Sequence, residues 1–299
     1  MMKLEDERMT KMHCRTLLCG FLVALALLIP LRPRTARAIA PTLITQCQTI
    51  DTPGFYEIET AIVTSTVGPC IDITGSGVTL SIEGGGLTGD GSHGTGIRIE
   101  HGAIGTVLQG WLQAGGPPVN SFNIGVEDDE GGSVISGFEA SHNATTGILL
   151  SHADGDTIMD VTAANNGHDG IRIMQTTGAR LDSNIYADNN GTYGLWLDGA
   201  ANTLLDRVEA SGNGTTNLEI STLGATASNA NLVYNANLHD APNGVVIEQG
   251  SGNNRVTRTG AYKGAHAKVA DGSDANPLCG SNVWFNNKFT KRKPTSCIH

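Results

Sequence analysis

The sequence is poor in charge and in aromatic side chains, and both shortages narrow what the protein can be. Charged residues make up 16% of the 299 positions and aromatic residues 5%. Low charge argues against an intrinsically disordered chain, which is usually highly charged. Basic residues number 19 against 29 acidic ones. We therefore expect no nucleic-acid partner, because phosphate binding depends on Lys and Arg.

Other familiar patterns are missing as well. Glu, Lys and Leu do not dominate as they do in helical bundles. Gly is abundant, at 39 residues, but lacks the strict period of three that collagen requires. No C-x-x-C spacing occurs, so a zinc ribbon or a redox dithiol has little support. What the chain does contain is a targeting segment and a long internal repeat.

The N-terminus has the features of a secretory signal. Leu17 to Leu31 is an uncharged apolar run of 15 residues, shorter than the ~20 residues needed to span a bilayer but suited to the core of a signal peptide. Lys11 and Arg15 precede it, and Ala36-Arg37-Ala38 follows as a cleavage site. We predict a signal peptide at residues 1–38, export of residues 39–299 and no membrane span after cleavage. The alternative is an uncleaved membrane anchor.

Cleavage leaves four cysteines, at positions 47, 70, 279 and 297. An even number in an exported chain suggests disulfides, and four cysteines allow three connectivities. Pairing of nearest neighbours, Cys47 with Cys70 and Cys279 with Cys297, would place one disulfide at each end of the exported chain.

The middle of the chain repeats the pattern Gly-apolar-any-apolar. Successive starts are spaced by 29, 22, 23, 24, 23 and 27 residues, and Asn replaces the Gly once. Apolar residues alternate with a period of two, which is typical of strands. A repeat near 23 residues with no helix-length segment favours one coil of a parallel β-helix. The starts are Gly96, Gly125, Gly147, Gly170, Gly194, Asn217 and Gly244.

Two further positions keep the same register. A second apolar strand is predicted around Ile158, Leu181 and Leu205, eleven residues after three successive starts. An amide or carboxyl side chain lies four residues before each of the last five starts, and amides stacked on successive coils can form a ladder. The predicted ladder consists of Asn143, Asn166, Asn190, Asn213 and Asp240.

These residues carry a resemblance to a known family. The stretch from Tyr56 to Ser296, with its opening Cys70-Ile71-Asp72-Ile73 and its ending Leu278-Cys279-Gly280, resembles secreted bacterial right-handed parallel β-helix proteins of the pectin-lyase-like superfamily. The resemblance implies an all-β, single-stranded, right-handed β-helix of about 8–10 coils with capped ends. We expect the caps at 39–69 and 260–299, the coils at 70–259, and a secreted or periplasmic location. Because the superfamily holds lyases, hydrolases, epimerases and adhesins, the resemblance does not decide the activity.

Alternation places the third residue of each motif on the outside of the coil. Arg172, Trp196 and Glu219 should be consecutive neighbours about 4.8 Å apart, with Asp198 beside them. We predict a glycan subsite here, in which the indole of Trp196 contacts a sugar ring and Arg172 binds a carboxylate. Glu219 or Asp198 would bind hydroxyls or act as acid or base. The alternative is an exposed face with no function.

The run Glu127-Asp128-Asp129-Glu130 is the densest acidic cluster. Glu127 and Asp129 are candidate ligands for Ca²⁺, which prefers carboxylate oxygens. Adjacent coils place Leu149 and Ser151 at the matching positions, so no second carboxylate should converge there. We therefore favour a solvated acidic bend, and expect no cofactor.

Three functions remain open from the sequence. The first is a non-catalytic exported protein that binds a polysaccharide or surface glycan through its flat face. The second is a polysaccharide lyase or epimerase acting on an acidic glycan, with Arg172, Glu219 and Asp198 as candidate catalytic residues. The third is a structural or adhesive rod. The first is favoured because the motifs of polygalacturonase-like hydrolases and alginate-epimerase-like proteins are absent. His168-Asp169 is interpreted as a bend.

Overall fold

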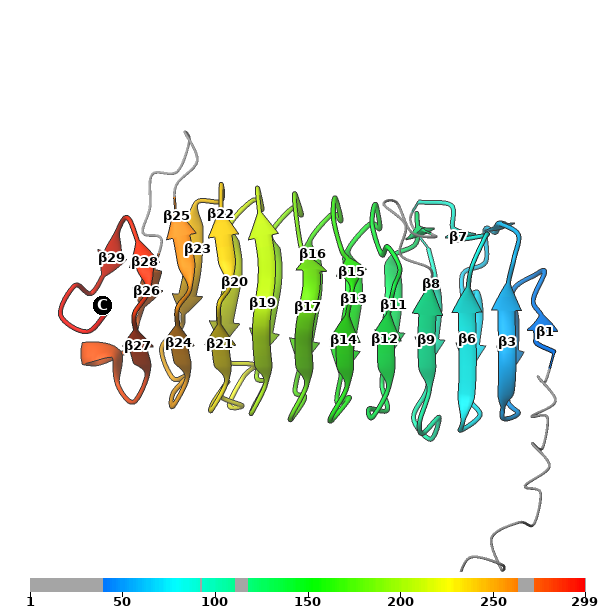
Figure 1. Ribbon diagram of the computed structural model, residues 1–299, viewed down its shortest axis with the longest axis horizontal. Coiled ribbons are helices and arrows are strands. Elements are labelled where there is room, and N and C mark those ends of the chain that lie inside the picture. The colour runs from blue at the N-terminus through cyan, green and yellow to red at the C-terminus, as the bar shows by residue number, and fades with distance from the viewer. Residues whose placement is uncertain (1–39, 92, 111–117, 263–271, 299) are drawn as a thin grey trace, which may run out of the picture. The chain divides into compact units, whose positions relative to one another are not determined.

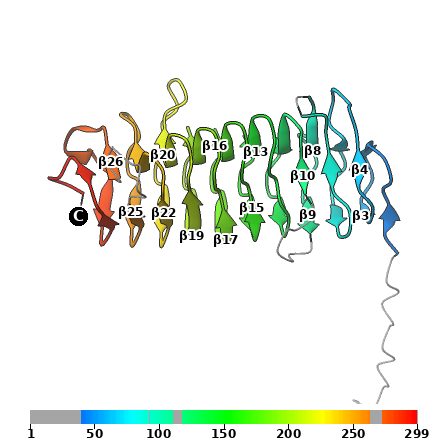
Figure 2. The ribbon, with the colours of Figure 1, turned by 90° about the horizontal axis from the view of Figure 1, so that it is seen from above.

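The computed structural model describes residues 40–91, 93–110, 118–262 and 272–298. The chain from Ala40 onward forms one compact unit, which is a stack of about ten coils (Figure 1 and Figure 2). Within the described residues the only helix is a short 3-10 helix, η1 (Pro277–Cys279). The predicted signal peptide, residues 1–38, lies outside the described residues.

Three parallel sheets form the sides of the stack. Sheet A has 15 strands, sheet B has 11 and sheet C has 3. Along sheet A run β1 (Thr42–Leu43), β3 (Gly54–Ile58), β6 (Val78–Ile82), β9 (Val107–Gly110), β12 (Val134–Ser136), β14 (Thr157–Met159), β17 (Arg180–Tyr186), β19 (Leu204–Ser211), β21 (Leu232–Tyr234), β24 (Arg255–Thr257) and β27 (Val283–Phe285), joined by β15 (Val161–Thr162), β22 (Asn237–His239), β25 (Gly260–Tyr262) and β28 (Lys288–Phe289). Sheet B consists of β2 (Gln48–Ile50), β5 (Ile71–Ile73), β8 (Thr95–Ile99), β11 (Ile124–Asp128), β13 (Thr146–Ser151), β16 (Asp169–Met174), β18 (Tyr193–Asp198), β20 (Thr216–Ser221), β23 (Asn243–Ile247), β26 (Gly272–Asp274) and β29 (Arg292–Lys293). Sheet C consists of β4 (Ile62–Val63), β7 (Leu87–Thr88) and β10 (Val119–Asn120).

The sequence repeat is the coil. Ile148 pairs with Ile171, Ile171 with Leu195, and Leu195 with Leu218 on successive strands of sheet B. All four side chains are at most 1% exposed, so each coil buries its aliphatic residues against its neighbours. The predicted all-β parallel β-helix is confirmed. Strand pairing runs from Thr42 to Lys293, so the segments expected as caps also contribute strands.

Asn143, Asn166, Asn190 and Asn213 form a buried ladder between coils. The Nδ2 of each donates to the Oδ1 of the next at 3.0–3.1 Å. Each of those oxygens also accepts the backbone N–H of the preceding ladder residue at 2.9–3.0 Å. The ladder and the adjacent backbone together explain the Gly at the repeat start, because a Cβ at Gly170 would lie 2.6 Å from the carbonyl oxygen of Gly194 and 2.7 Å from the Nδ2 of Asn190.

Asp240, expected as the fifth member, lies outside the ladder. His239 pairs with Ser211, and counting on from that pair places Ala241 rather than Asp240 opposite Asn213. The cause is a bend one residue shorter than the preceding one, which shifts the register between the ladder position and the repeat start. Asp240 is exposed, and its Oδ2 lies 2.7 Å from the Nδ1 of His239.

The ladder ends on Asn217, the residue that replaces Gly at a repeat start. Its Oδ1 accepts from Asn213 at 2.7 Å, and its Nδ2 donates to the carbonyl of His239 at 2.9 Å. The substitution therefore satisfies the last amide of the ladder, which would otherwise lack an acceptor on the next coil.

A second Asn ladder lies at another bend and was not predicted. The Nδ2 of Asn231 donates to Asn254 at 3.0 Å, and that of Asn254 donates to Asn282 at 3.2 Å. These residues are spaced by 23 and 28 positions, so the irregular coil lengths near the C-terminus hide the pattern from a search at one fixed period.

The structure contains the two nearest-neighbour disulfides, Cys47–Cys70 and Cys279–Cys297. Cys47 and Cys70 immediately precede β2 and β5, which pair in register, so this disulfide joins two successive coils. The second disulfide ties η1 to the last described residues. Each end of the stack thus carries one covalent link.

Candidate functional site

The outer face of sheet B carries three rows of polar and aromatic side chains over β16, β18 and β20. Arg172, Trp196 and Glu219 pair in register, as predicted from their spacing. Two flanking rows pair in the same way, one near the beginning of each strand and one at its end. We call these nine residues the sheet-B patch. They are Asp169, Arg172, Met174, Tyr193, Trp196, Asp198, Thr216, Glu219 and Ser221.

Arg172 is held between a carboxylate and an indole. Its Nη2 lies 2.5 Å from the Oδ2 of Asp198, and its guanidinium carbon lies 3.8 Å from the centre of the Trp196 ring. A carboxylate and an aromatic face both stabilise the positive charge. Arg172 is therefore suited to act as a fixed cation rather than as a base.

The indole of Trp196 reaches from β18 to β20. Its Nε1 donates to the Oγ of Ser221 at 2.7 Å, and that hydroxyl lies 3.4 Å from the Oδ1 of Asp198. The ring of Tyr193 is tilted against it by 50°, with ring centres 4.8 Å apart. Both aromatic residues are half-buried. Their orientation is thus fixed while part of their surface stays open to solvent.

Glu219 and Asp198 are less accessible than the sequence suggested. Their exposed fractions are 4% and 1%, whereas outward-facing positions were expected to be open. Alternation along a strand decides which face of the sheet a side chain lies on. It does not decide how far large neighbours on the same face, such as Trp196, shield that side chain from solvent. Burial and the nearby carboxylate of Glu248 raise the pKa of Glu219 to about 8. Its carboxyl is therefore mostly protonated at neutral pH and can donate a hydrogen bond.

Sequence reasoning missed the row of the patch near the beginning of the strands, which consists of Asp169, Tyr193 and Thr216. Asp169 was assigned with His168 to a bend, yet it is 3% exposed, and burial raises its pKa to about 6 against the opposing effect of Arg172. Tyr193 and Thr216 were not identified. Each member of the row lies three residues before a predicted site residue, Arg172, Trp196 or Glu219. That recurrence is the signal that would have found them.

The acidic cluster is not the solvated bend that was expected. The Oε2 of Glu127 accepts from the hydroxyl of Thr95 at 3.2 Å, and Asp129 lies 3.7 Å from Arg98. Asp128 between them is fully buried. Its Oδ1 accepts the backbone N–H groups of Glu130 and Gly131, at 2.8 and 3.2 Å. It therefore closes the bend from the inside.

Carboxyl groups of adjacent coils come near one another at Asp128, a buried position that the sequence analysis did not consider. Asp156 on the next coil is also fully buried, and its Oδ1 accepts the backbone N–H of Ser133 at 2.8 Å. Burial and the charge of Asp128 raise the pKa of Asp156 to about 8, so the carboxyl of Asp156 is mostly protonated at neutral pH. In the part of the chain that the structure describes, no cluster of three or more His, Cys, Asp or Glu is arranged to hold a metal ion.

No helix among the described residues is long and apolar enough to cross a membrane.

The sheet-B patch brings together a fixed cation, a protonated carboxyl and two partly open aromatic rings. Such a surface offers an apolar platform together with hydrogen-bond donors and acceptors.

Comparison with known proteins supports the fold and leaves the activity open. Residues 123–291, more than half of the chain, match the family described as right-handed beta helix region. No curated protein sequence matches the chain.

Several solved structures share the architecture. The Dettilon tailspike protein gp208 superposes with a TM-score of 0.59 at 15% identity, over 82% of this chain and 53% of the tailspike, so this chain spans about half the length of that protein. The A-module of Azotobacter vinelandii mannuronan C-5 epimerase AlgE6 has a TM-score of 0.48 at 13% identity, covering 81% of this chain and 84% of the module. Pectate lyase Pel9A has a TM-score of 0.39 at 13% identity, covering 87% and 71%. At such identities the likeness shows the fold alone.

Proposed function

The chain belongs to the right-handed β-helix family, and on that premise we propose that it is an exported protein that binds a carbohydrate polymer through the outer face of sheet B. The observation that carries the proposal is the fixed, half-open pair of Trp196 and Arg172 in the sheet-B patch. Disulfides at both ends support export, because such bonds persist in oxidising compartments.

Saccharides present apolar ring faces edged by hydroxyl groups, and the sheet-B patch offers partners for both. The rings of Trp196 and Tyr193 provide the apolar surface. Arg172 provides donors, which its contact with the buried carboxylate of Asp198 holds in place. Because these groups are already ordered by contacts with one another, little conformational freedom would be lost on binding.

The test compares two arginines of the same outward column. Arg172 and Arg98 lie three coils apart on sheet B, and only Arg172 belongs to the patch. Affinity of the purified protein for a panel of soluble acidic and neutral polysaccharides is measured by affinity electrophoresis. We expect Trp196→Ala and Arg172→Ala each to weaken binding by about tenfold or more, while Arg98→Ala binds as the unchanged protein does. Equal binding by all three variants would refute the proposal.

A second candidate function is supported by the environment of Glu219. A carboxyl with a pKa of about 8 can give or take a proton near neutral pH, and the guanidinium of Arg172 lies in the same patch. These groups suit a lyase or epimerase acting on an acidic glycan, in which Arg172 would neutralise a uronate carboxylate.

Activity distinguishes this candidate from binding alone. The protein is incubated with acidic polysaccharides, with and without Ca²⁺, and absorbance of unsaturated uronate is followed together with chain length and the ratio of uronate epimers. New unsaturation that Glu219→Gln abolishes would establish a lyase. A changed epimer ratio would establish an epimerase. Glu127→Gln is the matched control, since Glu127 lies in the same outward column but outside the patch. Binding without turnover favours the first function, and the absence of both favours a structural or adhesive rod.

A further inference from the structure

One coil is a residue longer than its neighbours, and the extra residue lies in β17. Repeat starts are 24 residues apart from Gly170 to Gly194, against 23 on either side. In the structure the pairing of β17 with β19 shifts by one residue between Asp182 and Ile185. This is a β-bulge, a feature that is over-represented beside functional sites.

The bulge is built from two residues in left-handed backbone conformation. Ser183 has φ of 63° and Asn184 has φ of 51°. The neighbouring coils use a single left-handed residue at this bend, Asp160 on one side and Arg207 on the other. Two successive non-Gly residues in this region carry a conformational cost that the surrounding structure has to offset.

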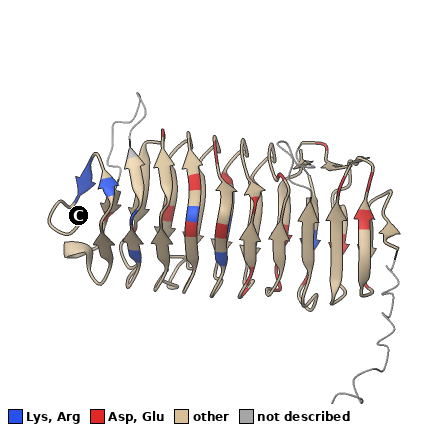
Figure 3. Ribbon diagram, in the orientation of Figure 1, with Lys and Arg blue, Asp and Glu red and all other residues tan. Residues whose placement is uncertain are grey.

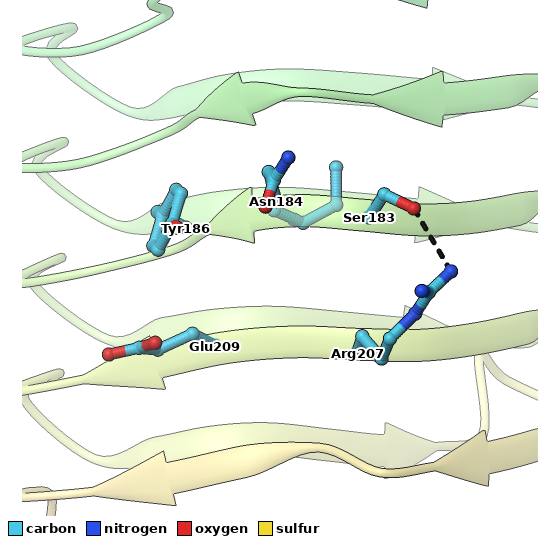
Figure 4. Close-up of a pocket in the computed structure, with 6 residues that line it drawn as sticks. Ser183, Asn184, Tyr186, Arg207 and Glu209 are labelled. Atoms are coloured by element: carbon cyan, nitrogen blue, oxygen red, sulfur yellow. Dashed lines mark hydrogen bonds between the residues drawn. The ribbon is translucent and has the colours of Figure 1, made fainter. Parts of the chain in front are cut away.

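The bulge borders a pocket on the outer face of sheet A (Figure 4). Tyr186 and Glu209 lie at one end of the pocket, and Ser183 and Arg207 at the other, with Asn184 between them on the side of β17. The cavity has a volume of about 230 Å³, below the ~300–1,000 Å³ of pockets that bury drug-sized ligands. It is therefore sized for one small ring rather than for a chain of them.

Carboxylates offset the charge of Arg207, the one basic residue that lines the pocket. Acidic and basic residues alternate along β17 and β19 (Figure 3). The Nη2 of Arg207 lies 2.7 Å from the Oδ1 of Asp182 and 3.1 Å from the Oγ of Ser183, and its Nε lies 3.5 Å from Asp206. Arg207 is thus oriented and offset by carboxylates, and Glu209 adds a further negative charge. An anionic ligand would find no net attraction here.

The remaining features select an uncharged, hydroxyl-rich ring. Tyr186 is 39% exposed and provides a flat apolar surface. Asn184 is exposed. Its Nδ2 donates to the Oδ1 of Asp160 on the preceding coil at 2.8 Å, and its Oδ1 is an acceptor, while Arg207 carries donors and Glu209 acceptors. We propose that this pocket is a second binding site, specific for a single uncharged sugar ring. It lies on a different sheet from the sheet-B patch and does not depend on the function proposed for that patch.

Binding is tested on the full chain by saturation-transfer NMR with methyl glycosides of uncharged hexoses and N-acetylhexosamines. We expect at least one glycoside to bind. Tyr186→Ala should weaken that binding by at least about threefold, the size of effect that removal of an aromatic contact gives. Deletion of Asn184, which restores the 23-residue coil, should abolish it. Because the deletion can disturb folding, Arg207→Gln serves as a second variant with an intact bulge, and circular dichroism verifies the fold of each.

Two controls separate this site from others. Tyr234→Ala removes a tyrosine of the same sheet that lies outside the pocket, and Trp196→Ala disrupts the sheet-B patch. Neither should change glycoside binding. The proposal is overturned if no uncharged glycoside binds, if folded Tyr186→Ala and Arg207→Gln bind like the unchanged protein, or if only Trp196→Ala reduces the signal. The last outcome would assign the sugar to the sheet-B patch instead.

Discussion

The surroundings of individual carboxyl groups in this protein shift their pKa values in opposite directions. Asp156 and Glu219 lie in places that exclude water, and burial raises the pKa of each to about 8. Asp182 lies on the outer face of sheet A, where hydrogen bonds from Arg180 and Arg207 lower its pKa to about 2. The chemistry available at each site therefore depends on packing and partners rather than on the residue type alone.

Glu219→Gln should flatten the pH dependence of folding stability. The pKa of Glu219 rises from 4.5 to about 8 in the fold, so the stability it contributes is fully present below pH 4.5 and is lost as the pH rises through about 8. The free energy of unfolding should fall over this interval, with a contribution from Glu219 of up to about 1.4 kcal/mol per pH unit. Gln cannot ionise, so the variant should lack this component.

Urea unfolding gives the free energy of unfolding at a series of pH values between 5 and 9. This range covers the interval over which the raised pKa of Glu219 changes the stability. Glu59→Gln, at an exposed position, is the matched control and should keep the slope of the unchanged protein. The same slope in Glu219→Gln would show that the carboxyl of Glu219 titrates normally.

At the scale of elements, the coil depends on a match between one Gly and one Asn. Gly170 is the second residue of β16, and the amide of Asn190 on the following coil lies against it. Asn190 accepts from the backbone and side-chain nitrogens of Asn166, and donates to the carbonyl of Ala163 and to Asn213. The bend between sheets A and B is thus set by side-chain hydrogen bonds inside the coil.

Asn190→Ala should destabilise the protein by about 1–3 kcal/mol, because it leaves buried donors and an acceptor without partners. Gly170→Ala should also destabilise it, since the added Cβ would lie 2.7 Å from the Nδ2 of Asn190. The double variant should lose less stability than the sum of the two, because one of the clashes disappears with the amide. Chemical unfolding gives the three values. Asp240→Ala, outside the ladder, is the control, and strict additivity would contradict the coupling.

At the scale of the whole stack, each coil contacts mainly the coils before and after it. Contacts between strands follow this order, with β13, β16, β18 and β20 forming an unbroken series. In such a structure the terminal coils have a neighbour on one side only and open most readily. The two disulfides lie at those ends, where a constraint on local opening has the largest effect.

Replacing Cys47 and Cys70 together by Ser should destabilise the protein by about 2–4 kcal/mol in the chain-entropy account of disulfides. Hydrogen exchange should accelerate in β2 and β5, which the bond joins, and stay unchanged in β16 and β18. Mass spectrometry of exchanged peptides resolves the two regions. The corresponding change of Cys279 and Cys297 is the matched comparison and should accelerate exchange only at the opposite end. Uniform acceleration along the chain would mean that the stack unfolds as one unit.

The sequence by itself determined the coil, because a period-two alternation repeated every 23 residues or so leaves one way to bury the aliphatic positions. From that period follow the stacked columns of Arg172, Trp196 and Glu219 and the ladder from Asn143 to Asn213. The prediction fails where the length of a coil changes, as at Asp240. A fixed spacing assigns a residue to a column correctly only if the bends between the strands have equal lengths.

Only the tertiary structure decided what covers each outward residue and which side chains meet between coils of unequal length. The burial of Glu219, the raised pKa of Asp156 and the pocket at the bulge of β17 all arise in this way. Alternation along a strand gives a side of the sheet. Accessibility, pKa and cavity shape depend instead on atoms that are distant in the sequence, and a repeat period carries no information about them.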